Sequence, residues 1–205
     1  MSEKKNQTNA HQNESQKTFV TATIRGTVVR KIRTAKSLIF AVASSNADAK
    51  KTDFPRFVAF ENLSEFDKTF SIGDRVTVVA HFRTSKKYPE GTLVPDSITV
   101  EKSRLDAAFA RESYLPDMNE FVIRGVMASD AYAPSDAATL ASIMVGQADG
   151  QKAYIRTIAF GHTAASLLKK KKGDSIDVIG YVRTKPSSEA KERSHTQSMV
   201  ITAVR

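Results

Sequence analysis

Residues 154–184 read YIRTIAFGHTAASLLKKKKGDSIDVIGYVRT, and a diverged copy, FPRFVAFENLSEFDKTFSIGDRVTVVAHFRT, occupies residues 54–84. Each copy has the pattern of a strand, a short helix, a turn and a second strand. The identities keep one register throughout: Arg56 with Arg156, Ala59 with Ala159, Phe60 with Phe160, Gly73-Asp74 with Gly173-Asp174, Val78 with Val178, and Arg83-Thr84 with Arg183-Thr184. Such a register predicts an internal duplication and therefore two similar domains.

The size and composition of the chain fit this organisation. Its 205 residues could form one large domain or two small ones, and the repeat favours two. A hydrophobic content of 40% is enough for two modest cores, each near the lower size limit of a self-sufficient domain. We therefore expect the two domains to pack closely on each other or to oligomerise.

The charge and the cysteine count narrow the classes of protein. There are 31 Lys and Arg residues against 22 Asp and Glu residues, a formal net charge of +9, which suits a polyanionic partner but fits an ordinary basic protein equally well. The absence of cysteine excludes disulfides, thiolate metal sites and cysteine nucleophiles. The sequence has no apolar run of transmembrane length and no secretory signal, so we expect a cytoplasmic protein with no membrane partner.

The first half predicts five strands and one helix. The strands are expected at 19–29, 37–44, 54–60, 75–83 and 93–100, and the helix within 61–70. Gly26 in the first strand predicts a bulge or bend, which a small barrel needs in order to curl. Five short strands with a helix between the third and the fourth is the order of an OB-fold, a partly open Greek-key barrel, although the pattern alone leaves other all-β folds open.

The second half repeats this plan, with strands expected at 120–127, 139–145, 154–160, 175–183 and 198–204. The predicted fold is therefore all-β with short helices, in two tandem OB-folds. Between them, Ser103 and Asp106 resemble a capping box and an apolar helical face ends at Pro116, so we expect a helix, with a flexible linker as the alternative. The predicted segments are a disordered polar tail at 1–17, OB-fold 1 at 18–100, a helical linker at 101–118 and OB-fold 2 at 119–205.

The second repeat resembles the bacterial single-stranded DNA-binding protein family. The likeness covers most of residues 119–183: an entry strand, NEFVIRGVMASDA, with a mid-strand Gly and an Asp after it, and then the segment quoted above, with Phe-Gly, an Ala-rich helix, Lys-Gly and a strand ending in Arg-Thr. The first repeat keeps the likeness more weakly, and the final hairpins hardly keep it. The resemblance implies OB-folds that bind single-stranded DNA.

The resemblance also implies which residues bind. The family's stacking aromatic, arginine and second aromatic of the third strand fall on Tyr154, Arg156 and Phe160, and in the first repeat on Phe54, Arg56 and Phe60. Strand alternation independently places Tyr154, Arg156 and Phe160 on one face. An aromatic, a cation and an aromatic in one row can stack bases and hold a phosphate.

Each of these residues also has a structural interpretation. Phe60 and Phe160 could equally fill a barrel core, whereas the strand-start aromatics and the in-strand arginines favour binding, because an unpaired arginine is costly to bury. The run of Lys169, Lys170, Lys171 and Lys172 could stabilise a helix C-terminus as a solvated face or could contact phosphate, and the first interpretation is slightly favoured. The ends of the fourth strands and the loops after them favour binding; these residues are Arg83, Lys86, Lys87, Tyr88, Arg183 and Lys185.

The chain departs from the family in two ways and resembles some of its members in a third feature. It has no tryptophan, so stacking would rest on Phe and Tyr. The family's glycine-rich tail with an acidic tip has no counterpart before Arg205, so we expect no recruitment of replication enzymes by that route. Two linked barrels resemble the tandem members of the family, and this is compatible with a homodimer.

Nothing in the sequence favours catalysis. The four histidines, His11, His81, His162 and His195, are scattered and do not have the spacing of metal ligands. No phosphate-binding glycine motif precedes a helix. We therefore expect no cofactor, no metal and no enzyme activity. The leading hypothesis is a protein that coats and protects single-stranded DNA without sequence preference during replication or DNA transfer, in the service of a plasmid, a phage or another mobile element. The alternatives are a scaffold that docks replication or conjugation enzymes, and a binder of single-stranded RNA.

Overall fold

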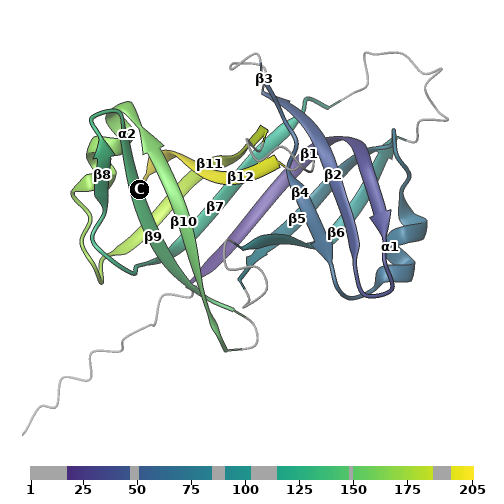
Figure 1. Ribbon diagram of the computed structural model, residues 1–205, viewed down its shortest axis with the longest axis horizontal. Coiled ribbons are helices and arrows are strands. Elements are labelled where there is room, and N and C mark those ends of the chain that lie inside the picture. Colours follow the sequence, from purple (N-terminus) through teal and green to yellow (C-terminus); the bar gives the residue numbers. More distant parts are fainter. Residues whose placement is uncertain (1–17, 47–50, 85–90, 103–114, 148–149, 187–194) are drawn as a thin grey trace, which may run out of the picture.

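In the computed structural model the chain forms two β-barrels that share one continuous sheet (Figure 1). The structure describes residues 18–46, 51–84, 91–102, 115–147, 150–186 and 195–205. These residues contain twelve strands and two helices, and the strands lie in the order β3-β2-β4-β6-β5-β1-β7-β11-β12-β10-β9-β8. The prediction of an all-β protein with two tandem OB-folds is confirmed.

The first barrel is built from the first six strands and α1. Its elements are β1 (Phe19–Arg33), β2 (Leu38–Asn46), β3 (Lys51–Asp53), β4 (Arg56–Ala59), α1 (Leu63–Thr69), β5 (Arg75–Arg83) and β6 (Thr92–Lys102). Antiparallel ladders join β1 to β2 and β5, and β5 to β6. A parallel contact between Phe57 of β4 and Leu93 of β6 closes the barrel.

The second barrel repeats this topology. Its elements are β7 (Met118–Met127), β8 (Tyr132–Ser135), β9 (Ala138–Gly146), β10 (Lys152–Phe160), α2 (Gly161–Leu168), β11 (Ser175–Pro186) and β12 (His195–Val204). The parallel pairing of β10 with β12 closes it, as β4 and β6 close the first. The helices α1 and α2 lie at the opposite outer ends of the molecule (Figure 1). Among the described residues, no helix is long and apolar enough to cross a membrane.

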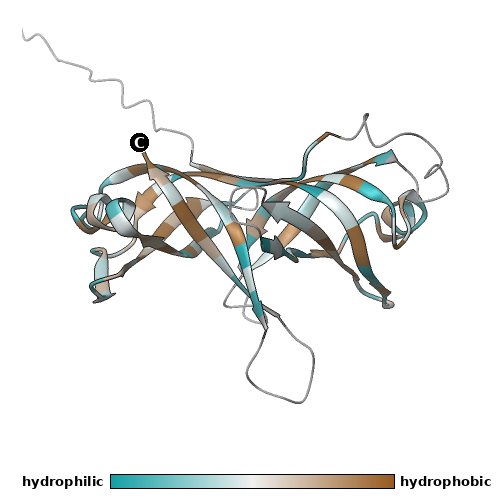
Figure 2. Cartoon of the chain, turned by 90° about the horizontal axis from the view of Figure 1, so that it is seen from above, coloured by the Kyte–Doolittle hydropathy of each residue, from teal (hydrophilic) through white to brown (hydrophobic). Residues whose placement is uncertain are grey.

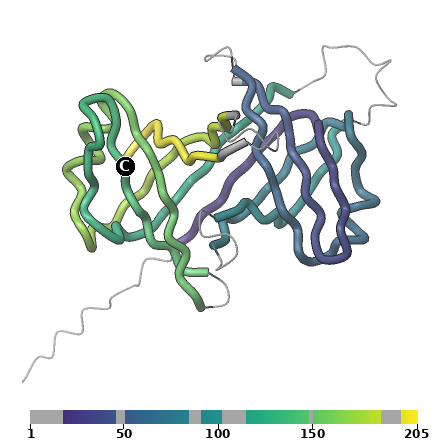
Figure 3. Tube along the Cα trace, viewed as in Figure 1, coloured from purple at the N-terminus to yellow at the C-terminus, as the bar shows by residue number. Residues whose placement is uncertain are grey.

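The two barrels are joined edge to edge by β1 and β7. The antiparallel ladder runs from the pair Phe19 and Arg124 to the pair Arg25 and Met118, with Ala22 opposite Phe121 at its centre. Because Arg25 and Arg124 occupy equivalent positions in the two repeats, the ladder relates the barrels by an approximate twofold axis. Figure 2 shows strands that run along one side of the molecule from barrel to barrel, and Figure 3 shows the barrels on either side of the seam. The close packing expected from the small size of each domain is therefore achieved by shared hydrogen bonding.

Each barrel encloses an apolar core. Burial alternates along the strands, as in β5, where every second side chain from Val76 to Phe82 is buried. In the first barrel the rings of Phe40 and Phe57 stack with centroids 4.9 Å apart, and Phe70 packs against Phe40 at the same distance. In the second barrel α2 contributes a fully buried Leu167 to the core, whereas α1 has no buried residue.

The bulge expected at Gly26 lies elsewhere in the same strand. Gly26 pairs regularly with Val76, and the bulge of this strand lies between Val28 and Arg30. A Cβ atom at Gly26 would lie 2.0 Å from the carbonyl oxygen of Ala43. The glycine therefore allows β2 to cross close over β1.

Two parts of the element prediction need correction. The first strand continues to Arg33 because the ladder between β1 and β2 extends to the pair Arg33 and Leu38. Thr34 and Ser37 form the turn, in which the hydroxyl of Thr34 accepts a hydrogen bond from the backbone N–H of Ser37. The short strands β3 and β8 were not predicted, since segments of three and four residues carry little periodicity.

The predicted linker is only partly described. Residues 101 and 102 belong to β6, and Met118 begins β7. Residues 103–114, where the helix was expected, and the tail at 1–17 lie outside the described residues. The linker helix and the domain boundaries therefore remain predictions.

Candidate nucleic-acid interface

Strand β10, which corresponds to the predicted third strand of the second repeat, carries an outward-facing row of side chains. Tyr154 and Phe160 are 50% and 38% exposed, and Arg156 between them is also exposed. The alternate side chains point inward and are buried, namely Ile155, Thr157 and Ala159. The predicted alternation is confirmed, and Phe160 belongs to the surface and not to the core. We call Tyr154, Arg156 and Phe160 the β10 row.

A second cation reaches this row from β11. The guanidinium carbon of Arg183 lies 5.1 Å from the centroid of the Phe160 ring, which is a cation–π contact. The Nε atom of Arg183 is buried and has no hydrogen-bond partner within the described part of the chain. The arrangement places aromatic faces next to guanidinium groups, which are the groups that hold bases and phosphates.

The corresponding row of the first barrel is less open. Arg56 is exposed, but Phe54 and Phe60 are half-buried, and Val58 between them is buried. The backbone of this segment is also engaged by the other barrel. The N–H of Phe54 donates a hydrogen bond to the Thr184 hydroxyl at 2.9 Å.

Two sets of hydrogen bonds fasten the first barrel to the hairpin of β11 and β12. The backbone N–H of Thr184 donates to Oδ1 of Asp53 at 2.7 Å, and the Thr184 hydroxyl donates to the same oxygen at 3.3 Å. The side chain of Gln197 accepts from the N–H of Arg56 and donates to its carbonyl oxygen. We call these contacts the inter-barrel strap. Sequence reasoning missed Asp53 and Gln197, because no local pattern marks a residue that acts on another domain.

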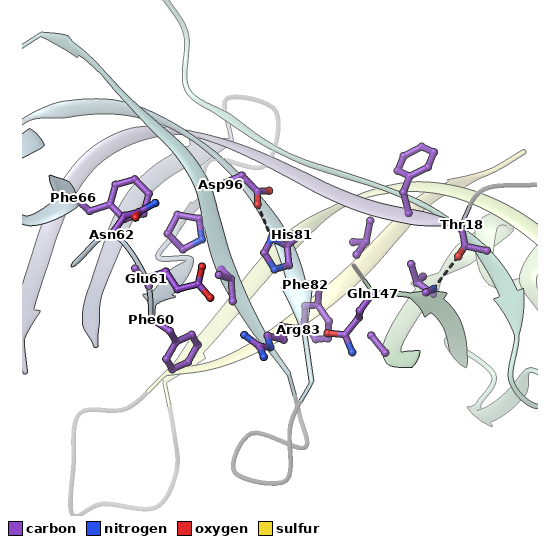
Figure 4. A pocket seen from close by; sticks show the side chains of 18 residues that line it. Thr18, Phe60, Glu61, Asn62, Phe66, His81, Phe82, Arg83, Asp96 and Gln147 are labelled. Carbon is purple, nitrogen blue, oxygen red and sulfur yellow. Dashed lines mark hydrogen bonds and ion pairs between the residues drawn. The ribbon is translucent and has the colours of Figure 1, made fainter. Parts of the chain in front are cut away.

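The positions that the approximate twofold axis makes equivalent to the strap residues hold different residues on the other side of the seam. Ala153 corresponds to Asp53, and Gly91 corresponds to Gln197, because Arg83 pairs with Thr92 as Arg183 pairs with Ser198. Ala153 has only a methyl group and Gly91 has no side chain, so neither residue can form the hydrogen bonds of the strap. A cavity of about 610 Å³ lies between the barrels here (Figure 4), and its lining includes Ala153.

The lysine run lies where α2 ends and turns toward β11. Lys169 is the C-cap of α2, which fits the helix-dipole interpretation. Asp130 fixes the turn, since it accepts a hydrogen bond from the Lys172 backbone N–H at 2.8 Å and pairs with the Lys171 ammonium at 3.5 Å. The hydrogen bond from Lys172 holds the pKa of the Asp130 carboxyl below its ordinary value. The ammonium group of Lys171 is thus partly neutralised, and the run lies beside β8, beyond the far end of α2 from β10 (Figure 1).

Several arginines that contribute to the net charge have structural roles. Arg25 pairs with Glu101 at 2.7 Å, and Arg75 pairs with Asp117 at 2.7 Å, which fastens the chain leading into β7 to the first barrel. In the second barrel the Arg124 guanidinium donates three hydrogen bonds to Asp177. These bonds lower the pKa of the Asp177 carboxyl and raise that of Arg124. The net charge therefore overstates the number of cations available to a ligand.

The remaining predicted residues are distributed as follows. Arg83 lines the cavity, and Lys185 is exposed on β11. Lys86, Lys87 and Tyr88 lie outside the described residues. Within the part of the chain that the structure describes, no group of three or more His, Cys, Asp or Glu residues could hold a metal ion.

No protein-family model matches the sequence, and no curated protein matches it either. Among solved structures, the fold is similar to that of the wild-type single-stranded DNA binding protein from Thermus aquaticus. The TM-score is 0.65 at 13% sequence identity, over 92% of this chain and 93% of that chain. A deletion mutant of the Thermus aquaticus protein gives a TM-score of 0.63 at 12% identity, over 92% and 94% of the two chains. The likeness extends over both barrels, so the shared fold includes their tandem arrangement.

Proposed function

We propose that this protein binds single-stranded DNA without sequence preference, as a diverged relative of the bacterial single-stranded DNA-binding proteins. The β10 row carries the proposal. It presents two aromatic side chains and one arginine on an exposed strand face, with Arg183 beside the second aromatic. The overall fold, similar to that of the Thermus aquaticus protein, supports the same function.

The chemistry of the row fits a strand and not a duplex. Aromatic side chains can stack only on bases that are not already paired and stacked, and each stacked base contributes about 1–3 kcal/mol. Every base has a π-face, so this interaction tolerates any sequence. Arg156 and Arg183 would hold the phosphates that connect the stacked bases.

The cellular role that we propose is the protection of single-stranded DNA during replication or DNA transfer, including that of a plasmid or phage. In this role the protein acts by occupancy and needs no catalysis. An RNA strand offers the same π-faces and phosphates, and contacts to the 2′-OH are what distinguish the two nucleic acids. Competition between DNA and RNA oligomers of matched sequence decides between them.

The test is a pair of tyrosine variants. Tyr154→Ala removes a stacking platform, and we expect the Kd for a fluorescent dT oligomer to rise by roughly 5- to 150-fold, the equivalent of about 1–3 kcal/mol. Tyr132→Ala is the matched control, because Tyr132 is 59% exposed on β8, outside the row. Equal affinities of the two variants, with both folds intact, would contradict the assignment.

A further inference from the structure

The cavity between the barrels exists because the two sides of the seam differ. On one side Asp53 and Gln197 strap the first barrel to the second. On the other side Ala153 and Gly91 provide no such polar side chains, and the cavity lies between the barrels, bridged by the hydrogen bond from the Gly146 N–H to the Thr18 hydroxyl at 2.8 Å. Gly91 has a φ of 82°, and a Cβ there would lie 1.9 Å from the Phe82 ring, so no larger residue fits without a shift of that ring. The open side is therefore built into the sequence.

The lining of this cleft combines aromatic surface with a cation. Phe60, Phe66 and Phe82 contribute from the first barrel, and Phe19 contributes from the start of β1. Arg83 lines the same space. Figure 4 shows Phe60, Glu61 and Phe66 toward one end of the cleft, Gln147 and Thr18 toward the other, and Arg83 between them.

Two carboxylates also belong to the lining. Asp96 is paired with Nδ1 of His81 at 2.7 Å, and Glu61 lies near Phe60. A carboxylate repels phosphate but accepts hydrogen bonds from the N–H groups of a base edge, including the ring N3–H of thymine. The cleft therefore suits a base edge near Glu61 and a phosphate near Arg83.

The cleft adjoins the β10 row. Tyr154 itself faces the opposite side of β10 from Ala153, but the cleft lies at the Tyr154 end of the strand, where Ala153 and its β9 neighbours Val145 and Gly146 line it. A strand that leaves the row past Tyr154 and turns around this end of β10 reaches the cleft. Its volume of about 610 Å³ lies within the range of about 300–1,000 Å³ that is typical of small-ligand sites, which is ample for one nucleotide.

We propose that single-stranded DNA passes from the second barrel to the first through this cleft and places one unstacked nucleotide in it. The base packs against Phe60, and Arg83 holds a phosphate. The inference rests on the proposed function and adds to it that the two barrels share one continuous path with one crossing point. The strapped side of the seam is closed to such a crossing.

The test uses two glutamines of the connection between β9 and β10. Gln147→Trp fills the cleft, whereas Gln151→Trp places the same bulk on an exposed residue outside the lining. For a dT oligomer long enough to span both barrels, we expect Gln147→Trp to weaken binding about tenfold, the scale of one stacked base, and Gln151→Trp to leave it unchanged. Circular dichroism and thermal unfolding check the fold of each variant.

A second measurement needs no variant. Oligo-dT with 5-iododeoxyuridine at single positions is photocross-linked to the wild-type protein, and the adducts are mapped by mass spectrometry. Adducts on Phe60 or Phe19 support the crossing. If the wild type binds dT but the adducts lie only on the β10 row, or if Gln147→Trp binds like Gln151→Trp, the crossing is refuted and the proposed function stands. If the wild type does not bind dT, the proposed function fails as well.

Discussion

The carboxylate of Asp53 accepts a hydrogen bond from the backbone N–H of Thr184 at 2.7 Å, although the two residues are 131 positions apart in the chain. Asp53 is only 6% exposed, so the bond is shielded from water. It fixes β3 of the first barrel against β11 of the second barrel. The seam of β1 and β7 and this contact together make the two barrels one unit.

Asp53→Ala should therefore lower the stability of the whole protein. The substitution leaves the Thr184 N–H without its acceptor in a partly buried place, which costs up to about 1–3 kcal/mol. Urea unfolding measures the loss. Asp53→Asn keeps a carbonyl acceptor and should lose less, whereas equal stability of Asp53→Ala and wild type would show that the strap contributes nothing.

Gly180 is a position where an added side chain would meet the backbone of the neighbouring strand. A Cβ there would lie 1.9 Å from the carbonyl oxygen of Val200 and 2.6 Å from the ring of Phe121. Gly180→Ala should cost roughly 1–3 kcal/mol or more, because the neighbouring strand must move. Gly146→Ala is the control, since its nearest contact would be the Thr18 hydroxyl at 3.3 Å. A thermal unfolding midpoint equal to that of the control would contradict the packing at Gly180.

The internal repeat carried most of the fold prediction. Repetition of strand, helix and strand in one register predicted two barrels, and period-two alternation predicted the outward row of Tyr154, Arg156 and Phe160. Both are local signals, so they can be extracted from the sequence of one chain.

The features between the barrels could not be predicted in this way. The pairing of β1 with β7 depends on which sheet edge each barrel leaves open, and the strap depends on where that pairing places Asp53. The same holds for the cleft. The sequence does not show that Ala153 and Gly91 occupy the positions equivalent to Asp53 and Gln197, which becomes visible only when the two sides of the seam are compared. The weaker likeness of Phe54 to Phe60 was visible in the sequence, but the contact of its backbone with the second barrel was not.

Acid should weaken the turn that carries the lysine run. The pKa of Asp130 is below its ordinary value of 3.8 in the folded protein, mainly because of the hydrogen bond from the Lys172 backbone N–H. A carboxyl whose pKa is lowered by folding contributes stability above its unfolded pKa and loses it as the pH falls through the folded value. The difference in stability between wild type and Asp130→Asn should thus be constant above about pH 5 and shrink below about pH 4. Urea unfolding at pH 7 and pH 3 measures it, and a difference that grows in acid would contradict this sign.

Arg183 should contribute to the electrostatic part of binding. On the proposed path it contacts one phosphate, so Arg183→Gln should raise the Kd and reduce the slope of log K against log salt by about 0.7. Arg30→Gln makes the same change of charge at an exposed position of β1, outside the predicted site, and should leave the slope nearly unchanged. The same reduction in both variants would show that net charge matters and that the place of Arg183 does not.

The most direct test of the central claim is a titration of the wild-type protein with a fluorescent dT oligomer at two salt concentrations, followed by the same titration with a duplex of equal length. A stacking surface flanked by arginines predicts tight binding to the dT oligomer that weakens as salt rises, and much weaker binding to the duplex at moderate salt. Comparable affinities for the two ligands at moderate salt would contradict the account.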